Sequence, residues 1–375
     1  MVTIIPVTNK RQLGLFVDLP DKLFHDDPTF VPLLRDSEIE VLDKARNPAR
    51  AFCEWEMYLA YKNGKPVGRV CALLNKAYNE KWNQNRVRFC RLDFIDDAEV
   101  ADALMEKVSD FARAKGAAEL QGPIGFCDFD PEGMQVEGFQ ERNLMITLFT
   151  PPYYPQHMDR MGFKKDVDWV EYQLPVPKEG IPRVKKVSDY VLKRSGLHVM
   201  EFKKPKDVIR SGAAKEILDL VDVAYAPLYG TVPITEEMKQ MYINQYFSML
   251  NLDYLVVLAD ENNHVKAFGL AVPGLERALK KTRGKIFPFG WILLLPEMKR
   301  SKHLDLLLVA VTPELQGRGL NSVLLALVNE RAIKNGIEYA ETGPNLETNL
   351  KVQEQWKMVE GARQHKRRRC YVRSV

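Results

Sequence analysis

The sequence VAVTPELQGRGLNS spans residues 309–322, and its interpretation determines that of the whole chain. It overlaps the end of the apolar run HLDLLLVAV (303–311), which is typical of a strand buried on both faces. Two glycines, Gly317 and Gly319, then lead into residues 320–334, where apolar side chains recur at helical spacing. The sequence therefore predicts a buried strand, a glycine-rich turn and a helix, in that order.

This turn has the properties of an anion-binding site. The first N–H groups of a helix have no partner within it, and the helix dipole places partial positive charge at that end. Gly317 and Gly319 let the backbone approach a ligand closely, and Arg318 adds a full positive charge. A pyrophosphate suits this arrangement. A strand-to-helix turn without a ligand would also explain the glycines, and their spacing matches neither the P-loop nor the dinucleotide-binding fingerprint.

Length and composition indicate two folded domains in a reducing compartment. The 375 residues are long for one domain, and 46% of them are hydrophobic, which is ordinary for a globular protein. Five scattered cysteines without a C-x-x-C pair argue against a disulfide framework and against a zinc site. The N-terminus lacks the pattern of a signal peptide, and no apolar run is long enough to span a bilayer. We therefore expect a soluble cytoplasmic protein with no metal ion and no transmembrane segment.

The two halves of the chain share one order of predicted elements. Each contains a hairpin, a further strand and then an amphipathic helix, which is residues 98–115 in the first half and 320–334 in the second. Residues 174–196 combine prolines, glycines and basic residues, as a linker with one exposed helix would. We infer a tandem duplication of one α/β unit, with an N-terminal domain at residues 1–178 and a C-terminal domain at residues 179–375.

The residues of the turn resemble the acyl-CoA-binding signature of the GNAT N-acyltransferases. That signature is Q/R-x-x-G-x-G/A; Gln316 and Gly319 match it, and Asn321 departs from it. The order of strands and helices in both halves is also similar to that of the GNAT fold. The resemblance implies two tandem GNAT-like domains of the α/β class, each a mixed, mainly antiparallel sheet flanked by helices.

The same resemblance implies where acyl-CoA would bind in the second half. The backbone of Val309, Ala310 and Val311 would pair with the pantetheine arm, and Asn349 would also contact it. The residues of the turn would hold the pyrophosphate: Gln316, Gly317, Arg318, Gly319, Leu320, Asn321 and Ser322. The co-substrate would be acetyl-CoA or a longer acyl-CoA.

The corresponding turn of the first half reads RLDFIDDAEV (91–100) and contains no glycine. Asp96, Asp97 and Glu99 crowd the start of its helix. Carboxylates at this place satisfy the helix dipole and repel a pyrophosphate. We therefore expect the first domain to keep the fold without binding acyl-CoA.

A general base for acyl transfer must accept a proton from the incoming amine. The candidates for this catalytic role are Glu341 and Glu347, which lie beyond the helix that follows the turn. A solvated loop or cap position is the alternative role for each. His303 and Asp305, on the buried strand, are weaker candidates.

The family's terminal segment contains a tyrosine that often protonates the departing thiolate. The first half has a similar segment, PPYYPQHMDRMGFKK (151–165), where aromatic packing is the favoured role for Tyr153 and Tyr154. In the second half Trp356 stands where the tyrosine is usual, and an indole is not a useful acid. The CoA thiolate would then leave without help from such a tyrosine.

Over nearly its whole length the sequence resembles a bacterial family of two-domain GNAT proteins that includes bacterial ceramide synthases. NGKPVGRV, GPIGFCDFDPEGMQVEGF and the ending KRRRCY carry this resemblance. It implies acyl transfer from acyl-CoA to an amine, which is a small molecule or a lipid amine such as a sphingoid base. Two alternatives stay open: a long-chain acyltransferase of the ceramide synthase kind, and a non-catalytic acyl-CoA-binding or scaffolding protein.

Three other segments bear on ligands. CDFDPEGMQVEGF (127–139) begins like a calcium loop, but Phe139 occupies the position of the bidentate glutamate, so no calcium site is predicted. IFPFGWILLL (286–295) would line a tunnel for a lipid tail or form a buried core helix. ARQHKRRRCYVR (362–373) would face an anionic ligand or form an exposed edge strand.

The net charge of +4 argues against nucleic acid as a partner, whereas peripheral contact with a membrane is compatible with the sequence. The oligomeric state is not predicted. Thr235 is expected to begin a helix whose shared face contains Met238, Met241, Tyr242, Gln245, Tyr246 and Met249.

Overall fold

The structure is a computed structural model that describes residues 1–247 and 250–375. The first half contains β1 (Val2–Pro6), α1 (Lys10–Phe24), α2 (Arg35–Leu42), η1 (Pro48–Ala51), β2 (Cys53–Lys62), β3 (Lys65–Asn75), α3 (Lys76–Trp82), β4 (Arg86–Phe94), α4 (Ala98–Ala114), β5 (Glu119–Gly122), β6 (Met134–Glu137), α5 (Tyr153–Arg160) and β7 (Lys164–Pro175).

The second half contains α6 (Pro182–Ser195), β8 (His198–Val199), α7 (Pro205–Arg210), α8 (Ala213–Tyr225), α9 (Glu236–Tyr246), η3 (Leu252–Tyr254), β9 (Leu255–Ala259), β10 (Val265–Pro273), α10 (Glu276–Thr282), α11 (Trp291–Arg300), β11 (His303–Val311), η4 (Pro313–Leu315), α12 (Leu320–Lys334), β12 (Tyr339–Thr342), β13 (Asn345–Leu346), α13 (Leu350–Lys357) and β14 (Arg363–Ser374). Thr235 caps α9 as predicted, whereas Met249 of the predicted helix face lies outside the described residues.

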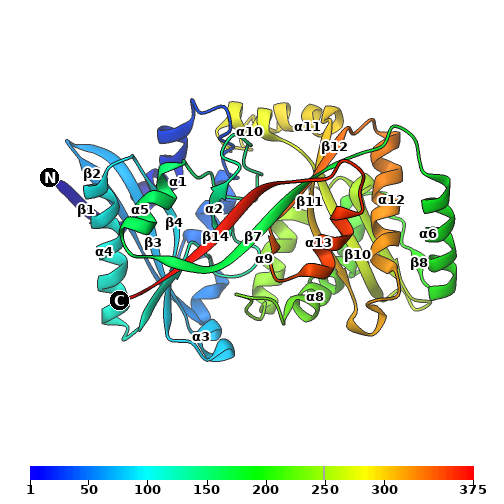
Figure 1. The fold of residues 1–375 in the computed structure, drawn as a ribbon, viewed down its shortest axis with the longest axis horizontal. Helices are drawn as coiled ribbons and strands as arrows, with labels where there is room; N and C mark the ends of the chain where they lie inside the picture. Colours follow the sequence, from blue (N-terminus) through cyan, green and yellow to red (C-terminus); the bar gives the residue numbers. More distant parts are fainter. Residues whose placement is uncertain (248–249) are drawn as a thin grey trace.

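One mixed sheet runs the length of the molecule, with helices packed on its two faces (Figure 1). Its strand order is β1-β2-β3-β4-β5-β14-β7-β12-β11-β10-β9-β8, with β13 beside β7 and β6 beside β14. Most neighbours are antiparallel, but β4 pairs in parallel with β5, and β11 pairs in parallel with β12. The predicted α/β class and the repeated order of elements are confirmed.

Local sequence explains the start of the helix in the first half. Asp97 is the N-cap of α4 and accepts a hydrogen bond from the N–H of Glu99, as predicted. The apolar residues of α4 recur every three or four positions, so one face of the helix is buried against the sheet: Val100, Ala101, Leu104, Met105, Val108, Phe111 and Ala112.

The last strand of the chain lies between the two halves. β14 pairs on one side with β5, where Tyr371 lies opposite Gly122, and on the other side with β7. β7 in turn pairs with β12 of the second half. β14, from the second half, therefore lies between two strands of the first half. β7, from the first half, lies between two strands of the second. The predicted boundary after residue 178 remains a prediction, and the sheet continues across it.

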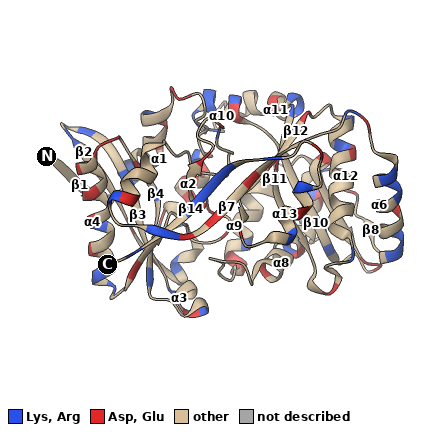
Figure 2. Ribbon diagram, in the orientation of Figure 1, with Lys and Arg blue, Asp and Glu red and all other residues tan. Residues whose placement is uncertain are grey.

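Opposite charges hold β14 beside β7 (Figure 2). Glu171 on β7 is buried between Lys366 Nζ, at 2.9 Å, and Arg368 Nε, at 2.5 Å. Burial alone would raise the pKa of Glu171, but the two cations lower it to about 2. An exposed edge strand, predicted for residues 362–373, is therefore wrong, because β7 supplies acidic partners for the basic side chains.

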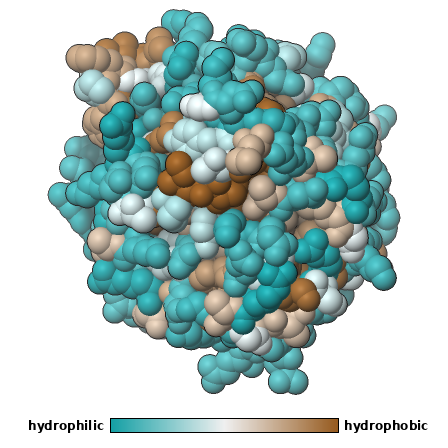
Figure 3. All heavy atoms as spheres, turned by 90° about the vertical axis from the view of Figure 1, so that its left-hand side faces the viewer, coloured by the Kyte–Doolittle hydropathy of each residue, from teal (hydrophilic) through white to brown (hydrophobic). Residues whose placement is uncertain are grey.

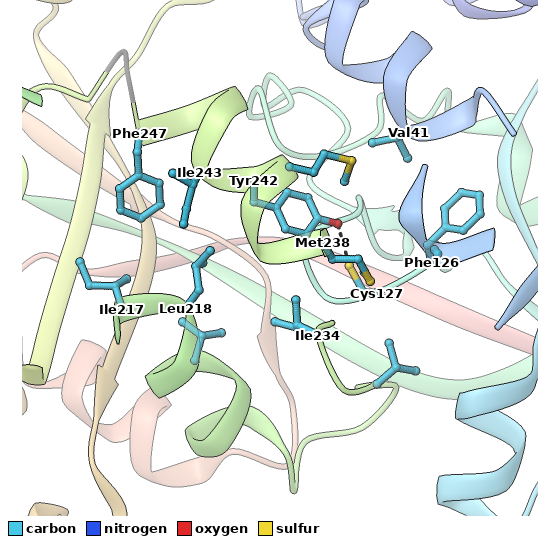
Figure 4. Packing of buried hydrophobic residues seen from close by; sticks show 14 of the residues in the cluster. Val41, Phe126, Cys127, Ile217, Leu218, Ile234, Met238, Tyr242, Ile243 and Phe247 are labelled. Atoms are coloured by element: carbon cyan, nitrogen blue, oxygen red, sulfur yellow. Dashed lines mark hydrogen bonds between the residues drawn. The ribbon is translucent and has the colours of Figure 1, made fainter. Parts of the chain in front are cut away.

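The two halves also share one hydrophobic core (Figure 4). Val41, Phe126 and Cys127 of the first half lie against side chains of α8 and α9. The Cys127 thiol is 2.9 Å from the hydroxyl of Tyr242 on α9. Removing one large side chain from such a core costs about 2–5 kcal/mol. The halves are therefore packed as one body.

The sequence predicted an interior position for the apolar segment 286–295, as the lining of a tunnel or as a core helix, but most of this segment is exposed. Leu294 is buried, but Phe287 and Phe289 are 71% and 72% exposed, and most of the N-terminal part of α11 is also exposed. A buried core helix is therefore the wrong interpretation. Since the hydrophobic side chains form no inward stripe, helical periodicity could not have placed them.

Candidate functional site

The edge of β11 becomes free where β12 ends. The parallel ladder runs from His303 opposite Tyr339 to Leu306 opposite Thr342, and the N–H of Gly343 donates to the Leu306 carbonyl at 3.0 Å. On the other side, β10 continues to pair with β11 as far as Val311. Residues 307–311 therefore have one edge without a strand partner among the described residues.

A tyrosine from α8 occupies part of this edge. The Tyr225 hydroxyl donates to the Val309 carbonyl at 3.1 Å and lies 3.4 Å from the Val309 N–H. Burial raises the pKa of Tyr225 to about 12, so the phenol is neutral at neutral pH and can donate a hydrogen bond. This contact could not be predicted from a local pattern, because Tyr225 lies 84 residues before Val309.

The turn after β11 presents a row of backbone donors. Gly317 and Gly319 have φ angles of 76° and 84°, a left-handed conformation that glycine adopts without strain. The N–H groups of residues 317–322 donate to no acceptor among the described residues. The side chain of Gln316 turns back and donates to the Val311 carbonyl at 3.1 Å, which fixes the start of the turn. Such a row of N–H groups at a helix start can bind an anion.

The other predicted residues of the turn differ in exposure. Arg318 and Ser322 are exposed, Asn321 is half-buried, and the Leu320 side chain is buried in the core beneath α12. Leu320 can therefore contribute only its backbone to a ligand. Asn349 precedes α13 and is half-buried, and its hydrogen bonds stay within the segment from β13 to α13.

The two predicted bases lie in ion-pair networks. Glu341 is 3% exposed on β12, with Lys366 Nζ at 3.3 Å and Arg142 at 3.7 Å. The Glu347 carboxylate is 2.7 Å from Lys165 Nζ and accepts from the backbone N–H of Asp168 at 3.2 Å.

His303 and Asp305 lie beside Glu341 in the sheet. The His303 ring stacks on Tyr339 at 5.1 Å, and its Nε2 is 3.3 Å from Glu276. Burial raises the pKa of Asp305 to about 7, which the His303 charge opposes. Asp305 and Glu341 are register partners on β11 and β12, so these groups share one buried network at the closed end of the strand pair.

A second acidic pair, missed from the sequence, lies where the halves meet. Burial raises the pKa of Asp128 to about 7, and it also raises that of Glu132, which lies on the same loop between β5 and β6. Oδ1 of Asp128 is buried and has no hydrogen-bond partner among the described residues. The Asp128 charge also raises the pKa of Tyr225, which links the loop to the β11 edge. Sequence reasoning tested this acidic loop only for calcium.

Trp356 has a structural role. It is 5% exposed and packs on β7 against Val170, Tyr172 and Leu174. Its indole N–H donates to Asn345 at 3.2 Å. The side chain that stands in place of the expected tyrosine therefore belongs to the core rather than to the free edge of β11.

No family model matches the chain. It is 26% identical over 377 residues to Protein YghO of Escherichia coli, which covers 98% of this chain and 94% of that protein. It is 23% identical over 305 residues to the bacterial ceramide synthase of Caulobacter vibrioides, with 80% and 77% covered. A solved tandem GNAT protein from the clavulanic acid biosynthesis pathway matches 100% of this chain over 98% of its own, at 13% identity and a TM-score of 0.59. The chain therefore has the tandem GNAT fold, and its sequence relatives include a bacterial ceramide synthase.

Proposed function

We propose that the protein is an acyl-CoA-dependent N-acyltransferase whose second half binds the acyl-CoA. The observation that carries this proposal is a free strand edge that leads into a helix start, where six backbone N–H groups have no acceptor in the described part of the chain. The tandem GNAT fold supports it. Pantetheine amides would pair with the backbone of residues 309–311, and the pyrophosphate would bind at residues 317–322 beside Arg318.

In the proposed reaction a neutral amine attacks the thioester carbonyl, so that a C–N bond forms and the C–S bond breaks. The CoA sulfur leaves as a thiolate, and the attacking nitrogen loses a proton. Tyr225 would serve as the hydrogen-bond donor to the developing thiolate, since its hydroxyl already lies at Val309. This role would replace the tyrosine acid for which Trp356 cannot substitute.

The proton of the amine needs an acceptor within reach. Glu341 and Glu347 remain the candidates from the sequence, although both are held by cations. Asp128 is an additional candidate, because a carboxyl group with a pKa of about 7 can accept a proton at neutral pH.

The acceptor is an amine of a small molecule or of a lipid. Similarity to the bacterial ceramide synthase over 80% of this chain favours a lipid amine and a long acyl chain as the second form of the proposal. The loop that carries Asp128 would then line the acceptor side of the site, at the junction of the halves.

Calorimetry with CoA, acetyl-CoA and palmitoyl-CoA tests binding, and release of free thiol in the presence of small amines and long-chain amino alcohols tests turnover. We expect binding of at least one of the three and thiol release with one amine class. Failure to bind any of them would contradict the proposal. Binding without thiol release for any amine would instead support a non-catalytic acyl-CoA-binding protein.

A further inference from the structure

Residues 286–295 expose an unusual amount of hydrophobic surface. They comprise the end of the connection between α10 and α11 and the first half of α11. Six large side chains within nine residues are exposed: Phe287, Phe289, Trp291, Ile292, Leu293 and Leu295. Single exposed hydrophobic residues are ordinary on a monomer, whereas a contiguous group marks a binding surface. We refer to these six residues as the apolar rim.

The apolar rim is fixed to the body of the protein. Leu294 is buried and packs in one cluster with Val31 and Leu279. The backbone N–H of Arg35 donates to the Gly284 carbonyl at 2.9 Å, which anchors the connection to the first half. Figure 3 shows hydrophobic atoms projecting from the upper edge, the level at which α10 and α11 lie in Figure 1. The exposed side chains are thus held outward by an anchored scaffold.

Basic residues surround the apolar rim. Residues 276–302 contain eight lysines and arginines and two glutamates, which gives this short segment more positive charge than the +4 of the whole chain. Both glutamates are partly buried, and Glu297 accepts from the backbone N–H of Arg277 at 3.0 Å. Five exposed cations have no ion-pair partner among the described residues: Arg277, Lys281, Lys285, Lys299 and Arg300.

The chemistry of this surface fits the boundary region of a bilayer. Aromatic side chains are stable at the level of the lipid headgroups, and aliphatic side chains insert just below it. Lysine and arginine next to them are attracted by anionic headgroups. A second copy of the chain is a poor occupant, because a symmetric contact would bring one ring of unpaired cations against the other.

No helix among the described residues is long and apolar enough to cross a membrane, so contact through this surface would be peripheral. We propose that the apolar rim and its flanking cations dock the protein on membranes that contain anionic phospholipid. The proposal stands on the exposed surface and its charge, and it does not depend on acyl transfer. Together with a lipid amine as acceptor, it would place the enzyme where its substrate resides.

Co-sedimentation with vesicles tests the proposal. We compare vesicles of phosphatidylcholine alone with vesicles of phosphatidylcholine and phosphatidylglycerol in equal parts. The full chain should bind the anionic vesicles at least about tenfold more tightly, and added salt should weaken this binding. Trp291 is the exposed one of five tryptophans, so its emission should shift to the blue on insertion, and Trp291→Phe should remove that shift.

Variants locate the surface. Phe287→Ser with Phe289→Ser should lower vesicle binding at least about tenfold, and Lys299→Glu with Arg300→Glu should do so for anionic vesicles. Since all four side chains are exposed, thermal unfolding should change little. Leu350→Ser with Met358→Ser removes two exposed hydrophobic side chains on and beside α13 and should leave binding unchanged.

Three results would overturn the proposal. The first is absence of binding to either kind of vesicle. The second is loss of binding on Val184→Ser with Tyr190→Ser, and not on the phenylalanine pair, because α6 also combines exposed hydrophobic and basic residues. The third is a dimer in sedimentation that the phenylalanine variant dissociates, without any vesicle binding.

Discussion

The first and second halves build their strand-to-helix turns differently on one fold. In the first half the hydroxyls of Tyr153 and Tyr154, from α5, bond the carbonyl and the N–H of Phe94 at the end of β4, at 2.6 and 2.7 Å. Tyr154 is buried and stacks on Phe94 at 4.2 Å. In the second half Tyr225 bonds the backbone of β11 at Val309 and Gln316 bonds it at Val311, and the turn beyond is exposed.

The starts of helices α4 and α12 also differ in whether side chains bond the backbone. Asp97 accepts from a backbone N–H at the start of α4, and Lys62 Nζ lies 2.9 Å from Glu99. Among the described residues no side chain caps α12, and its first N–H groups donate to no acceptor. A domain can thus keep the fold while its own side chains form the hydrogen bonds to the backbone that a ligand would otherwise form. In the first half the protein itself supplies acceptors at the turn, and in the second half we propose that a ligand supplies them.

The most severe test of this comparison places a negative charge in the open turn. Gly317→Asp should weaken CoA binding by on the order of 100-fold, because a carboxylate beside the pyrophosphate costs about 2–3 kcal/mol. Gly116→Asp is its matched control, since both glycines have a positive φ and open space at the Cβ position. Calorimetry of both variants measures the difference. Equal CoA affinities would remove the pyrophosphate from this turn.

The second test concerns the acidic loop that the first half contributes to the junction. The pKa of Asp128 is raised to about 7, so the folded protein holds a proton that the unfolded chain releases at lower pH. Stability should therefore fall as pH rises between the ordinary aspartate pKa and about 7, and Asp128→Asn should flatten this loss in thermal unfolding. If Asp128 is the base, kcat/KM should rise through about pH 7 and lose that limb in the variant. An unchanged pH–rate profile would return the role to Glu341 or Glu347.

Exchange of the edge tyrosines should separate stability from turnover. Tyr154→Phe leaves the buried N–H of Phe94 without an acceptor, so we expect a loss of about 1–3 kcal/mol in the free energy of unfolding. Tyr225→Phe should cost less than about 1 kcal/mol there and should lower kcat roughly tenfold with CoA affinity unchanged. Denaturant unfolding and steady-state kinetics on both variants measure this. A Tyr225→Phe enzyme with normal kcat would reduce that residue to packing.

The smallest effect comes from making the open turn resemble the closed one. Ser322→Asp puts a carboxylate in the first turn of α12, where it should add about 0.3–1 kcal/mol of stability through the helix dipole. The same charge should lower CoA affinity by roughly fivefold. Thermal unfolding without ligand and calorimetry with CoA should thus move in opposite directions. If stability and CoA affinity both rose or both fell, the assignment of the pyrophosphate to this turn would be contradicted.

The sequence predicted the elements well because local signals specify them. Asn63-Gly64 marks the hairpin of β2 and β3, and the apolar run at residues 303–311 marks the strand β11. The position of β14 was not predictable in this way. Its basic residues favour a solvent-exposed edge strand. It can be an interior strand only because β7, about 200 residues away, supplies acidic partners.

The residues of the candidate site also fall into two groups, those that local sequence predicts and those that it does not. Residues 316–322 follow from one short motif, since glycine spacing and a helix start are local properties. Tyr225 reaches β11 through the packing of α8 within the second half, and Asp128 lies on a loop of the first half; no short window of sequence encodes either placement. The exposed Phe287 and Phe289 escaped prediction because apolar composition alone favours burial.

The placement of β14 has a consequence for how the chain folds during synthesis. The ribosome completes β5 at Gly122, but the strand that pairs with it there, from Tyr371 onward, is made about 250 residues later. At about 5–20 residues per second, the edge of the first half's sheet waits roughly ten to fifty seconds for its neighbour. Throughout that time β5 lacks this partner, and an unpaired strand edge invites pairing with other chains. The nascent chain therefore keeps an unpaired strand edge until the twelve residues of β14 complete the sheet.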